Sequence, residues 1–235
     1  MKPDQVVPEA TSTNDLAREL GLAGAPSGSW ISARRQIAGR GRMGRRWESL
    51  EGNLFFSMIA RGVPKRLLTW IPLTAGVAAA RAISSVAPEI RVSLKWPNDL
   101  RVDDNKLGGI LCEACEDFVI IGIGINCAQA PQGLDQETCS LSDEAARPVS
   151  ADELRPALVE ELRGALGELS SRGWREIADA YESLASLGPG TEIEWAGNRG
   201  LVLGLGDHGE LRVRRADGAV QRLFAEDVWA VRPSL

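Results

Sequence analysis

The sequence predicts an α+β protein with a small β-barrel-like domain at its C-terminal end. Up to residue 187, segments with the apolar spacing of helices are interspersed with segments of strand-like alternation. From Gly188 onward, short strands follow one another closely, separated by Gly or Asp-Gly turns. A chain of 235 residues with 44% hydrophobic residues can form a substantial core. We therefore expect two domains, residues 1–187 and 188–235.

The first elements are predicted from one amphipathic segment and two apolar strands. A helix is expected to begin near Ser12 or Thr13 and to end at Gly21, where glycine can adopt the left-handed conformation. The strand-like segments GSWISARR and GNLFFSMIAR follow, so the chain between them forms a loop from strand to strand. The small apolar residues of 69–86 predict a buried helix, which tolerates Pro72 because this proline lies in its first turn.

Three further strands are expected in RVSLKW, KLGGILCEA and FVIIGIGIN, and the last two form a hairpin. Alternation in the last strand separates four large apolar residues from a face that is nearly bare. The bare face carries Ile120, Gly122, Gly124 and Asn126, and the apolar face carries Val119, Ile121, Ile123 and Ile125. A bare face can admit a ligand or a closely packed helix, and the segment alone favours neither.

Two helices are expected after a polar loop, over about 151–170 and 173–187. Ser150 and Glu153 have the spacing of a capping box at the start of the first helix. Pro156 is expected to kink that helix, because proline removes a backbone donor.

Charge is distributed unevenly along the chain. The 27 Lys and Arg residues and 32 Asp and Glu residues give a net charge of −5, which is too small to indicate a nucleic-acid or membrane partner. Six arginines nevertheless fall within the arginine loop, residues 34–46, and without them 21 basic residues face 32 acidic ones. Its glycines let the backbone approach a ligand, and guanidinium groups suit phosphate oxygens. We interpret it as a phosphate-binding loop that is mobile without its ligand. A solvated basic loop and an RNA-contacting segment are the alternatives, and the acidic remainder disfavours RNA.

Several common kinds of site are disfavoured. The motif GxGxxG occurs at 39–44 and 204–209, but neither copy opens a helix. Cys112 and Cys115 form a CxxC on a strand, where residues three apart point to opposite faces, so free thiols are expected. With His208 as the single histidine, nucleophilic catalysis by a Ser/His or Cys/His pair is not indicated. No signal peptide or membrane span is evident, which predicts a cytoplasmic location.

Two lysines mark a second group of candidate residues. The segment 95–100, KWPNDL, ends a strand with a stiff turn. Lys106 begins the glycine-bearing strand, where its ammonium group can reach an anion that gains charge during a reaction. Taken alone, Lys106 would be interpreted as a surface lysine.

Together these segments resemble the motifs of the biotin protein ligases. They are Ser12-Thr13-Asn14, Gln36 with GRGRMGRRW (39–47), KWPNDL (95–100), KLGGIL (106–111) and GIGIN (122–126), in the order of that family. The resemblance implies a mixed β-sheet catalytic domain of the biotin/lipoate ligase type and an SH3-like C-terminal β-barrel. Only eleven residues precede Ser12, so we expect the monofunctional form, which lacks the family's N-terminal helix-turn-helix domain.

The resemblance implies a reaction in two steps. Biotin is activated with MgATP to biotinyl-5'-AMP, pyrophosphate is released, and biotin is then transferred to a lysine of a biotin carboxyl carrier domain. ATP and Mg2+ are the implied cofactors. DNA and membranes are not expected as partners, and a homodimer stays open. The alternatives are a lipoate or octanoyl ligase or transferase on the same fold, and a noncatalytic binding protein.

Roles for individual residues also follow from the resemblance. The implied catalytic residues are Lys106, Arg40 and Arg42. Biotin is expected to contact Ser12, Thr13, Asn14, Gln36, Gly39, Arg40, Gly108 and Gly109. ATP and the adenylate are expected to contact Arg40, Arg42, Arg45, Trp47, Lys106 and Asn126. No metal ligand is assigned, since Asn98 and Asp99 fit a metal-related or a structural role. Some relatives carry an arginine where this chain has SADEL, so an adenine-side contact near 147–154 stays open.

Overall fold

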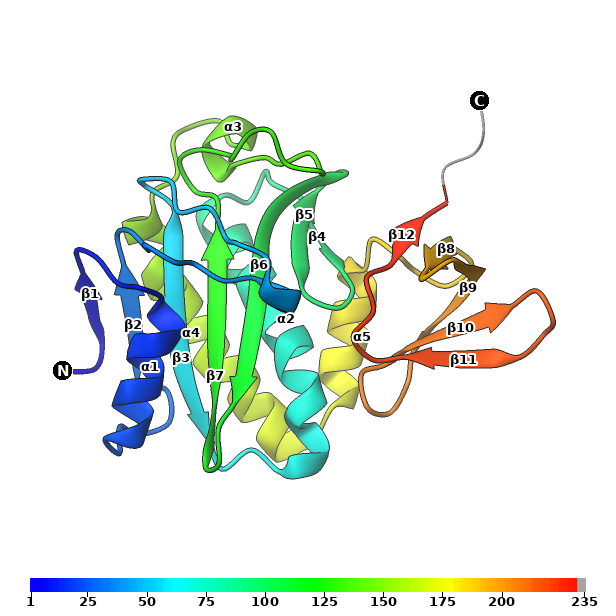
Figure 1. Cartoon of the computed structure of the whole chain (residues 1–235), viewed down its shortest axis with the longest axis horizontal. Helices are drawn as coiled ribbons and strands as arrows, with labels where there is room; N and C mark the ends of the chain where they lie inside the picture. Colours follow the sequence, from blue (N-terminus) through cyan, green and yellow to red (C-terminus); the bar gives the residue numbers. More distant parts are fainter. Residues whose placement is uncertain (232–235) are drawn as a thin grey trace.

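A computed structural model describes residues 1–231 of the chain (Figure 1). Its body contains a seven-stranded mixed sheet with the order β1-β2-β3-β7-β6-β5-β4. β1 runs parallel to β2, and the other neighbouring strands are antiparallel. The strands are β1 (Gln5–Val7), β2 (Trp30–Ala33), β3 (Leu54–Arg61), β4 (Val92–Lys95), β5 (Asp99–Val102), β6 (Asn105–Ala114) and β7 (Phe118–Ile125). The predicted mixed sheet is confirmed, and β1 and β5 are strands that the sequence patterns did not indicate.

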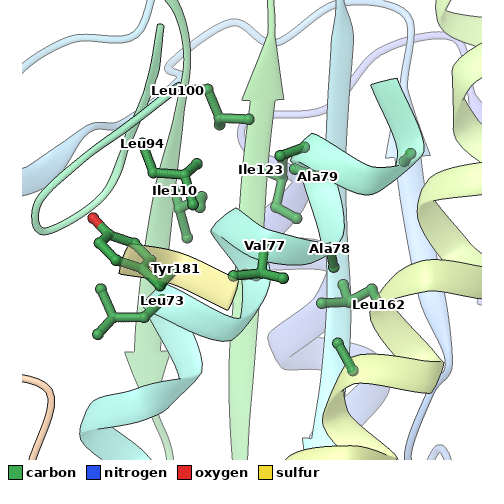
Figure 2. Packing of buried hydrophobic residues seen from close by; sticks show 14 of the residues in the cluster. Leu73, Val77, Ala78, Ala79, Leu94, Leu100, Ile110, Ile123, Leu162 and Tyr181 are labelled. Carbon is green, nitrogen blue, oxygen red and sulfur yellow. The ribbon is translucent and has the colours of Figure 1, made fainter. Parts of the chain in front are cut away.

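Helices cover both faces of this sheet. They are α1 (Thr13–Leu22), α2 (Ile71–Val86), the short α3 (Leu141–Glu144), α4 (Ala151–Arg172) and α5 (Arg175–Leu184), with 3-10 turns at Arg42–Gly44 and Lys65–Trp70. Alternation in β7 divides the core as predicted. Ile121 and Ile123 join the large cluster with α2 and α4, as Figure 2 shows for Ile123, whereas Ile120 joins a smaller cluster with Ala17 and Leu20 of α1.

Helix α2 forms the centre of the larger cluster. Six of its residues are alanine or glycine, and most of its side chains are buried against β6, β7 and α4. The span Lys65–Val86 is long and apolar enough to cross a membrane, but 72% of its apolar window is buried inside the protein. Its apolar composition is therefore explained by its position in the core. Pro72 lies in the first turn of α2, as expected.

Two expectations about helix ends need correction. Helix α1 continues through Gly21 to Leu22, and the residue with positive φ is Gly24. Gly21 is instead a packing position, because a Cβ there would lie 2.4 Å from the Phe118 ring. The Ser150 side chain caps α4 by accepting from the Glu153 N–H, but the Glu153 carboxylate binds Arg147, so the capping box is only half formed. Pro156 lies inside α4 without ending it, and the kink expected there stays a prediction.

The C-terminal residues form a second sheet, which lies beside α5 in Figure 1. Its strands are β8 (Glu192–Trp195), β9 (Asn198–Leu205), β10 (Leu211–Arg215), β11 (Val220–Leu223) and β12 (Trp229–Ala230). They pair in the order β11-β10-β9-β8-β12, all antiparallel, and these pairings do not close the sheet into a barrel. The sheet shares its core with the body, and Trp70 and Trp96 each donate an indole N–H across the junction, to the carbonyls of Asp207 and Gly209, at 3.0 Å.

Candidate functional site

A cavity opens on the face of the large sheet that carries the bare strand positions. Its walls come from the start of α1, the arginine loop, β6 and β7, the loop 128–140, and the C-terminal segment 227–229. Eleven of the predicted site residues line it. They are Ser12, Thr13, Asn14, Gln36, Arg40, Arg42, Arg45, Trp47, Lys106, Gly109 and Asn126. Segments separated by more than 200 residues in the sequence thus form one site.

The glycines on this face are required by what packs on them. A Cβ at Gly122 would lie 2.3 Å from Asn14 Oδ1, and one at Gly124 would lie 2.6 Å from the Trp47 ring. Gly109 is similarly close to Trp47, at 3.2 Å. The bare face is therefore covered partly by the first turn of α1 and partly by the indole of Trp47, which directly follows the arginine loop.

The structure does not bring two predicted residues into the cavity wall. A Cβ at Gly39 would lie 2.7 Å from the Trp47 carbonyl, so this glycine allows the close turn that carries Trp47. A Cβ at Gly108 would lie 2.7 Å from the Gly124 carbonyl and near Leu100, on the core side of β6. Residues 147–154 also lie outside the wall.

One end of the cavity is polar but lacks a positive charge at its base. The Thr13 N–H donates to Gln36 Oε1 at 2.8 Å, and the Ser57 hydroxyl lies 2.8 Å from Thr13 Oγ1 and 2.7 Å from Asn14 Oδ1. Ser12, at the start of α1, is buried and makes no side-chain capping bond, so its hydroxyl is left to the cavity. This end can hold a small neutral group that has both donors and acceptors.

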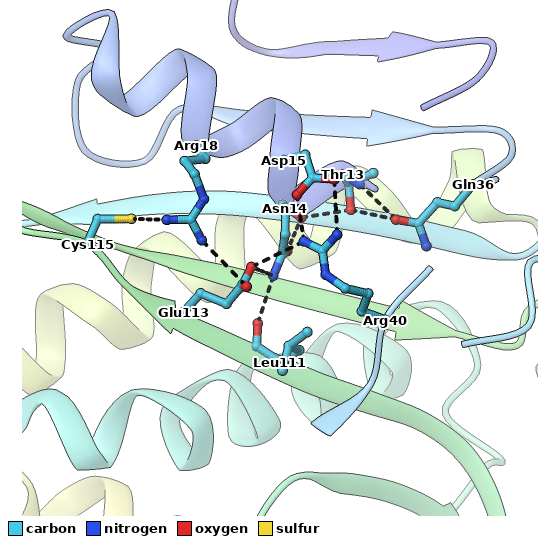
Figure 3. A network of polar contacts seen from close by, with 10 residues as sticks. Thr13, Asn14, Asp15, Arg18, Gln36, Arg40, Leu111, Glu113 and Cys115 are labelled. Atoms are coloured by element: carbon cyan, nitrogen blue, oxygen red, sulfur yellow. Dashed lines mark hydrogen bonds and ion pairs between the residues drawn. The ribbon is translucent and has the colours of Figure 1, made fainter. Parts of the chain in front are cut away.

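Arg40 lies beside this polar end, where its guanidinium contacts two acidic side chains (Figure 3). Its guanidinium makes a two-pronged contact with Asp15, at 2.6 and 3.0 Å, and lies 3.9 Å from Glu113. The hydrogen bond that Arg40 donates to Asp15 raises the pKa of Arg40, and the charge of Glu113 adds to that effect. Glu113 also accepts from the Asn14 amide at 2.7 Å. The charge of Arg40 is thus matched before any ligand arrives.

Arg42 and Arg45 are paired in a similar way, to Asp227 in the C-terminal segment. Arg45 lies 3.1 Å from Asp227, and Arg42 lies 3.8 Å from it. Arg42 also donates to Asn98 Oδ1 at 2.9 Å and to the Ala225 carbonyl. Burial lowers the pKa of Arg42, although a guanidinium still keeps its charge. In this structure, ion pairs join the arginine loop to Asp15 of α1 and to Asp227, and its mobility without a ligand stays a prediction.

Lys106 occupies the centre of the cavity beside Trp47. Its Nζ lies 2.8 Å from Asp99 and 5.8 Å from the Trp47 ring centroid. The Asn98 amide donates to the Ile110 carbonyl at 2.9 Å while its oxygen accepts from Arg42. In this structure Asn98 therefore orients Arg42, and Asp99 orients Lys106. These contacts give both residues a structural role.

Lys95 is a cavity residue to which the sequence patterns assigned no role. It is 7% exposed, and its Nζ lies 3.6 Å above the Trp229 ring. Burial, and to a smaller extent the neighbouring charge of Arg101, lowers the pKa of Lys95 to about 8. The sequence feature that could have identified Lys95 as a site residue is its position in the KWPNDL segment, at the end of a strand.

Asn126 makes hydrogen bonds within the protein. Its amide nitrogen donates to the Cys139 carbonyl at 3.0 Å, and its backbone N–H donates to the Leu107 carbonyl at 2.9 Å. It is 2% exposed. Asn126 therefore fastens the loop 128–140 to the ends of β6 and β7.

The cysteines and acids offer no separate site in residues 1–231. All four cysteines are free, as predicted, and burial raises the pKa of Cys112 and Cys127 to about 12. Such thiols stay protonated and are poor nucleophiles. Within the same residues, no group of three or more His, Cys, Asp or Glu side chains is placed to hold a metal ion.

The chain is similar in sequence and structure to known biotin ligases. The Biotin/lipoate A/B protein ligase family matches residues 6–126. The bifunctional ligase/repressor BirA of Bacillus subtilis is 34% identical over 233 residues, which cover 93% of this chain and 71% of BirA. The biotin--[acetyl-CoA-carboxylase] ligase of Paracoccus denitrificans is 31% identical, covering 88% of this chain and 92% of that protein. The biotin protein ligase from Aquifex aeolicus, solved in complex with biotin and ATP, superposes with a TM-score of 0.85 at 27% identity, covering 98% of this chain and all of that one.

Proposed function

The chain belongs to the Biotin/lipoate A/B protein ligase family, and we infer that it is a biotin protein ligase. It activates biotin with ATP, releases pyrophosphate and forms biotinyl-5'-AMP, and then transfers biotin to a lysine of a biotin carboxyl carrier domain. Biotin rather than lipoate is the substrate. Two relatives are named as biotin--[acetyl-CoA-carboxylase] ligases, and the similar structure from Aquifex aeolicus is a biotin protein ligase solved with biotin and ATP.

The observation that carries this inference is the joining of two unlike regions in one cavity. The polar end around Thr13 and Gln36 suits the ureido ring of biotin, which has two N–H donors and a carbonyl. Next to it lies a group of six cations that suits a carboxylate and a triphosphate together. These are Arg40, Arg42, Arg45, Arg46, Lys95 and Lys106.

The first step needs electrostatic help rather than a base. A biotin carboxylate is already ionised at pH 7, so it can attack the α-phosphate directly. The barrier is the approach of two anions, and fixed cations lower it by matching the charge that develops on the phosphoryl oxygens. We propose that Lys106 and Arg42 act on these oxygens and that Arg40 orients the carboxylate. Trp47 would cover the adenylate and limit its contact with water.

In the second step, a lysine amine of the carrier domain attacks the acyl carbon of the mixed anhydride. The C–N amide bond forms, the acyl C–O bond breaks, AMP leaves and the amine proton passes to solvent. The cavity opens to solvent beside exposed Leu134 and Trp229, where a carrier lysine could enter. The carrier domain is the partner that this chemistry requires.

Magnesium is proposed to enter with ATP. The acids nearest the cations are already paired, Asp99 with Lys106 and Asp227 with Arg45, so an ion held mostly by phosphates and water fits this site better than a protein cage. When bound, Mg2+ would neutralise phosphate charge. A cytoplasmic location is proposed because the four thiols are free and ATP is the substrate.

The test is biotinylation of a carrier domain, followed by its mass. We expect one biotinyl addition that needs biotin and ATP and does not occur with lipoate. Arg40→Ala should reduce pyrophosphate release severely, and Arg35→Ala is the matched control, because Arg35 belongs to the arginine loop but does not line the cavity. An unmodified carrier in an assay in which a known ligase succeeds would refute the function.

A further inference from the structure

We propose that the positive charge of Lys95 assists the second step, by keeping the amine of the incoming carrier lysine unprotonated inside the cavity. The inference rests on the proposed function, since it concerns the transfer of biotin from the adenylate. A lysine amine in solution is almost entirely protonated at pH 7, and only the neutral amine can attack the acyl carbon. The transfer step therefore has a requirement that the adenylation step lacks.

Lys95 lies close to the opening through which an amine enters. It is the last residue of β4, and its Nζ lies 3.6 Å from the centroid of the Trp229 ring. Trp229 is 47% exposed, whereas Lys95 is 7% exposed and lines the cavity wall. Lys106 is near enough for its charge to act on Lys95. An amine that enters beside Trp229 and reaches an adenylate held at Lys106 therefore comes close to the Lys95 charge.

The charge balance of the cavity changes when pyrophosphate leaves. Six cations and three carboxylates line the wall, and the carboxylates are those of Glu48, Asp99 and Asp227. MgATP and biotin together bring a negative charge that matches this excess. Biotinyl-5'-AMP carries a single negative charge, so a net positive charge remains once pyrophosphate has gone. Positive surroundings disfavour an ammonium ion, which lowers the pKa of an amine that enters.

The amine of Lys95 already shows the effect of these surroundings. Burial, and to a smaller extent the charges of Arg101 and Lys106, lowers its pKa to about 8. The acids that face it, Asp99 and Asp227, act in the opposite direction. Both are already paired with other cations, at 2.8 and 3.1 Å. A carrier amine enters the same region and meets one further positive neighbour, which is Lys95 itself.

This role is the opposite of that of a general base. A base must have lost its proton, whereas the proposed effect requires the ammonium form of Lys95. The position of Nζ over the Trp229 ring favours that charged form. Arginine keeps its charge at every accessible pH and cannot accept a proton, so Lys95→Arg separates the two roles.

The experiment measures transfer alone. Protein loaded with preformed biotinyl-5'-AMP is mixed with a biotin carboxyl carrier domain, and the mass of the carrier is followed. At pH 7 we expect transfer by Lys95→Met to be about tenfold slower, the effect of about one pKa unit on the carrier lysine, and transfer by Lys95→Arg to stay near the unmodified rate. At pH 9.5, where Lys95 has largely lost its proton, Lys95→Arg should be the fastest of the three. Lys65→Met is the matched control, because Lys65 is exposed and does not line the cavity.

Hydroxylamine provides a second measurement that does not depend on the carrier. It is already neutral at pH 7, so its attack on the bound adenylate needs no prior loss of a proton. The rate of transfer to the carrier, divided by the rate of transfer to hydroxylamine, should therefore fall about tenfold in Lys95→Met at pH 7.

Each outcome decides for or against this role. Transfer by Lys95→Met at the unmodified rate at pH 7 would overturn it. Equal slowing of the hydroxylamine reaction would also overturn it, because that result means a misplaced adenylate. Faster transfer by the unmodified protein than by Lys95→Arg at pH 9.5 would make Lys95 a base and contradict the proposal. If the unmodified protein transferred no biotin to the carrier, the proposed function itself would fail.

Discussion

Replacing Lys95 by methionine is expected to make the protein more stable and less active. Lys95 is 7% exposed, and burial lowers its pKa from an ordinary 10.5 to about 8. At pH 7 the folded protein therefore holds an ammonium ion where water solvates it poorly. A cation–π contact with the Trp229 ring, whose centroid lies 3.6 Å from Nζ, offsets part of this cost. Methionine fills a similar space without a charge.

The size of the effect follows from these values. A pKa lowered by about 2.5 units corresponds to a cost of about 3 kcal/mol for the charged form in the folded state, at roughly 1.4 kcal/mol per unit. Contact with the indole returns up to about 2 kcal/mol. The free energy of unfolding of Lys95→Met should therefore exceed that of the unmodified protein by about 1–2 kcal/mol at pH 7. ATP should bind more weakly, because one cation of the phosphate site is lost.

The pH dependence has a definite sign. Between pH 8 and 10.5 the unfolded chain retains the Lys95 proton while the folded protein has released it, so the stability of the unmodified protein rises with pH in this window. Relative to Lys95→Met, it should gain about 2 kcal/mol between pH 7 and 9.5. Urea unfolding of both proteins at the two pH values measures this, and the comparison cancels the titration of the buried thiols. A stability difference that is the same at both pH values would refute the lowered pKa.

Three other predictions concern the cavity. Lys106→Ala should reduce pyrophosphate release at least about a hundredfold with little change in the circular dichroism spectrum, because Lys106 is proposed to stabilise charge in the transition state; normal release would exclude that role. Gly122→Ala should weaken biotin binding measured by calorimetry, since a Cβ would lie 2.3 Å from Asn14 Oδ1 and displace it, and unchanged affinity would show that Asn14 does not shape the pocket. Asp227→Asn should lower the KM for ATP by releasing Arg45, 3.1 Å away, and a raised KM would mean that this carboxylate supports nucleotide binding.

The sequence predicted the parts of the fold that depend on local periodicity. Alternation in β7 correctly separated Ile121 and Ile123 from Gly122 and Gly124, because a strand imposes this pattern without reference to distant residues. The end of α1 was predicted wrongly, since the absence of a side chain at Gly21 reflects the Phe118 ring, which lies 97 positions further along.

The site was predicted as a set of cations, but not as a set of contacts. Arginines spaced by glycines were visible in the sequence, whereas their partners come from other parts of the chain, such as Asp227 for Arg45. Lys95 could not be assigned for the same reason, because burial is a property of the assembled cavity. Local sequence patterns therefore identify the charged residues of a site, whereas their ion-pair partners depend on tertiary contacts.

The pairing of the arginines with Asp15 and Asp227 also determines which anions the empty cavity admits. A small anion such as inorganic phosphate gains one or two contacts by entering, and each contact requires a carboxylate to move away from its arginine. A triphosphate engages several cations at once and can displace both carboxylates together. We therefore expect the two aspartates to weaken the binding of small anions more than the binding of nucleotides.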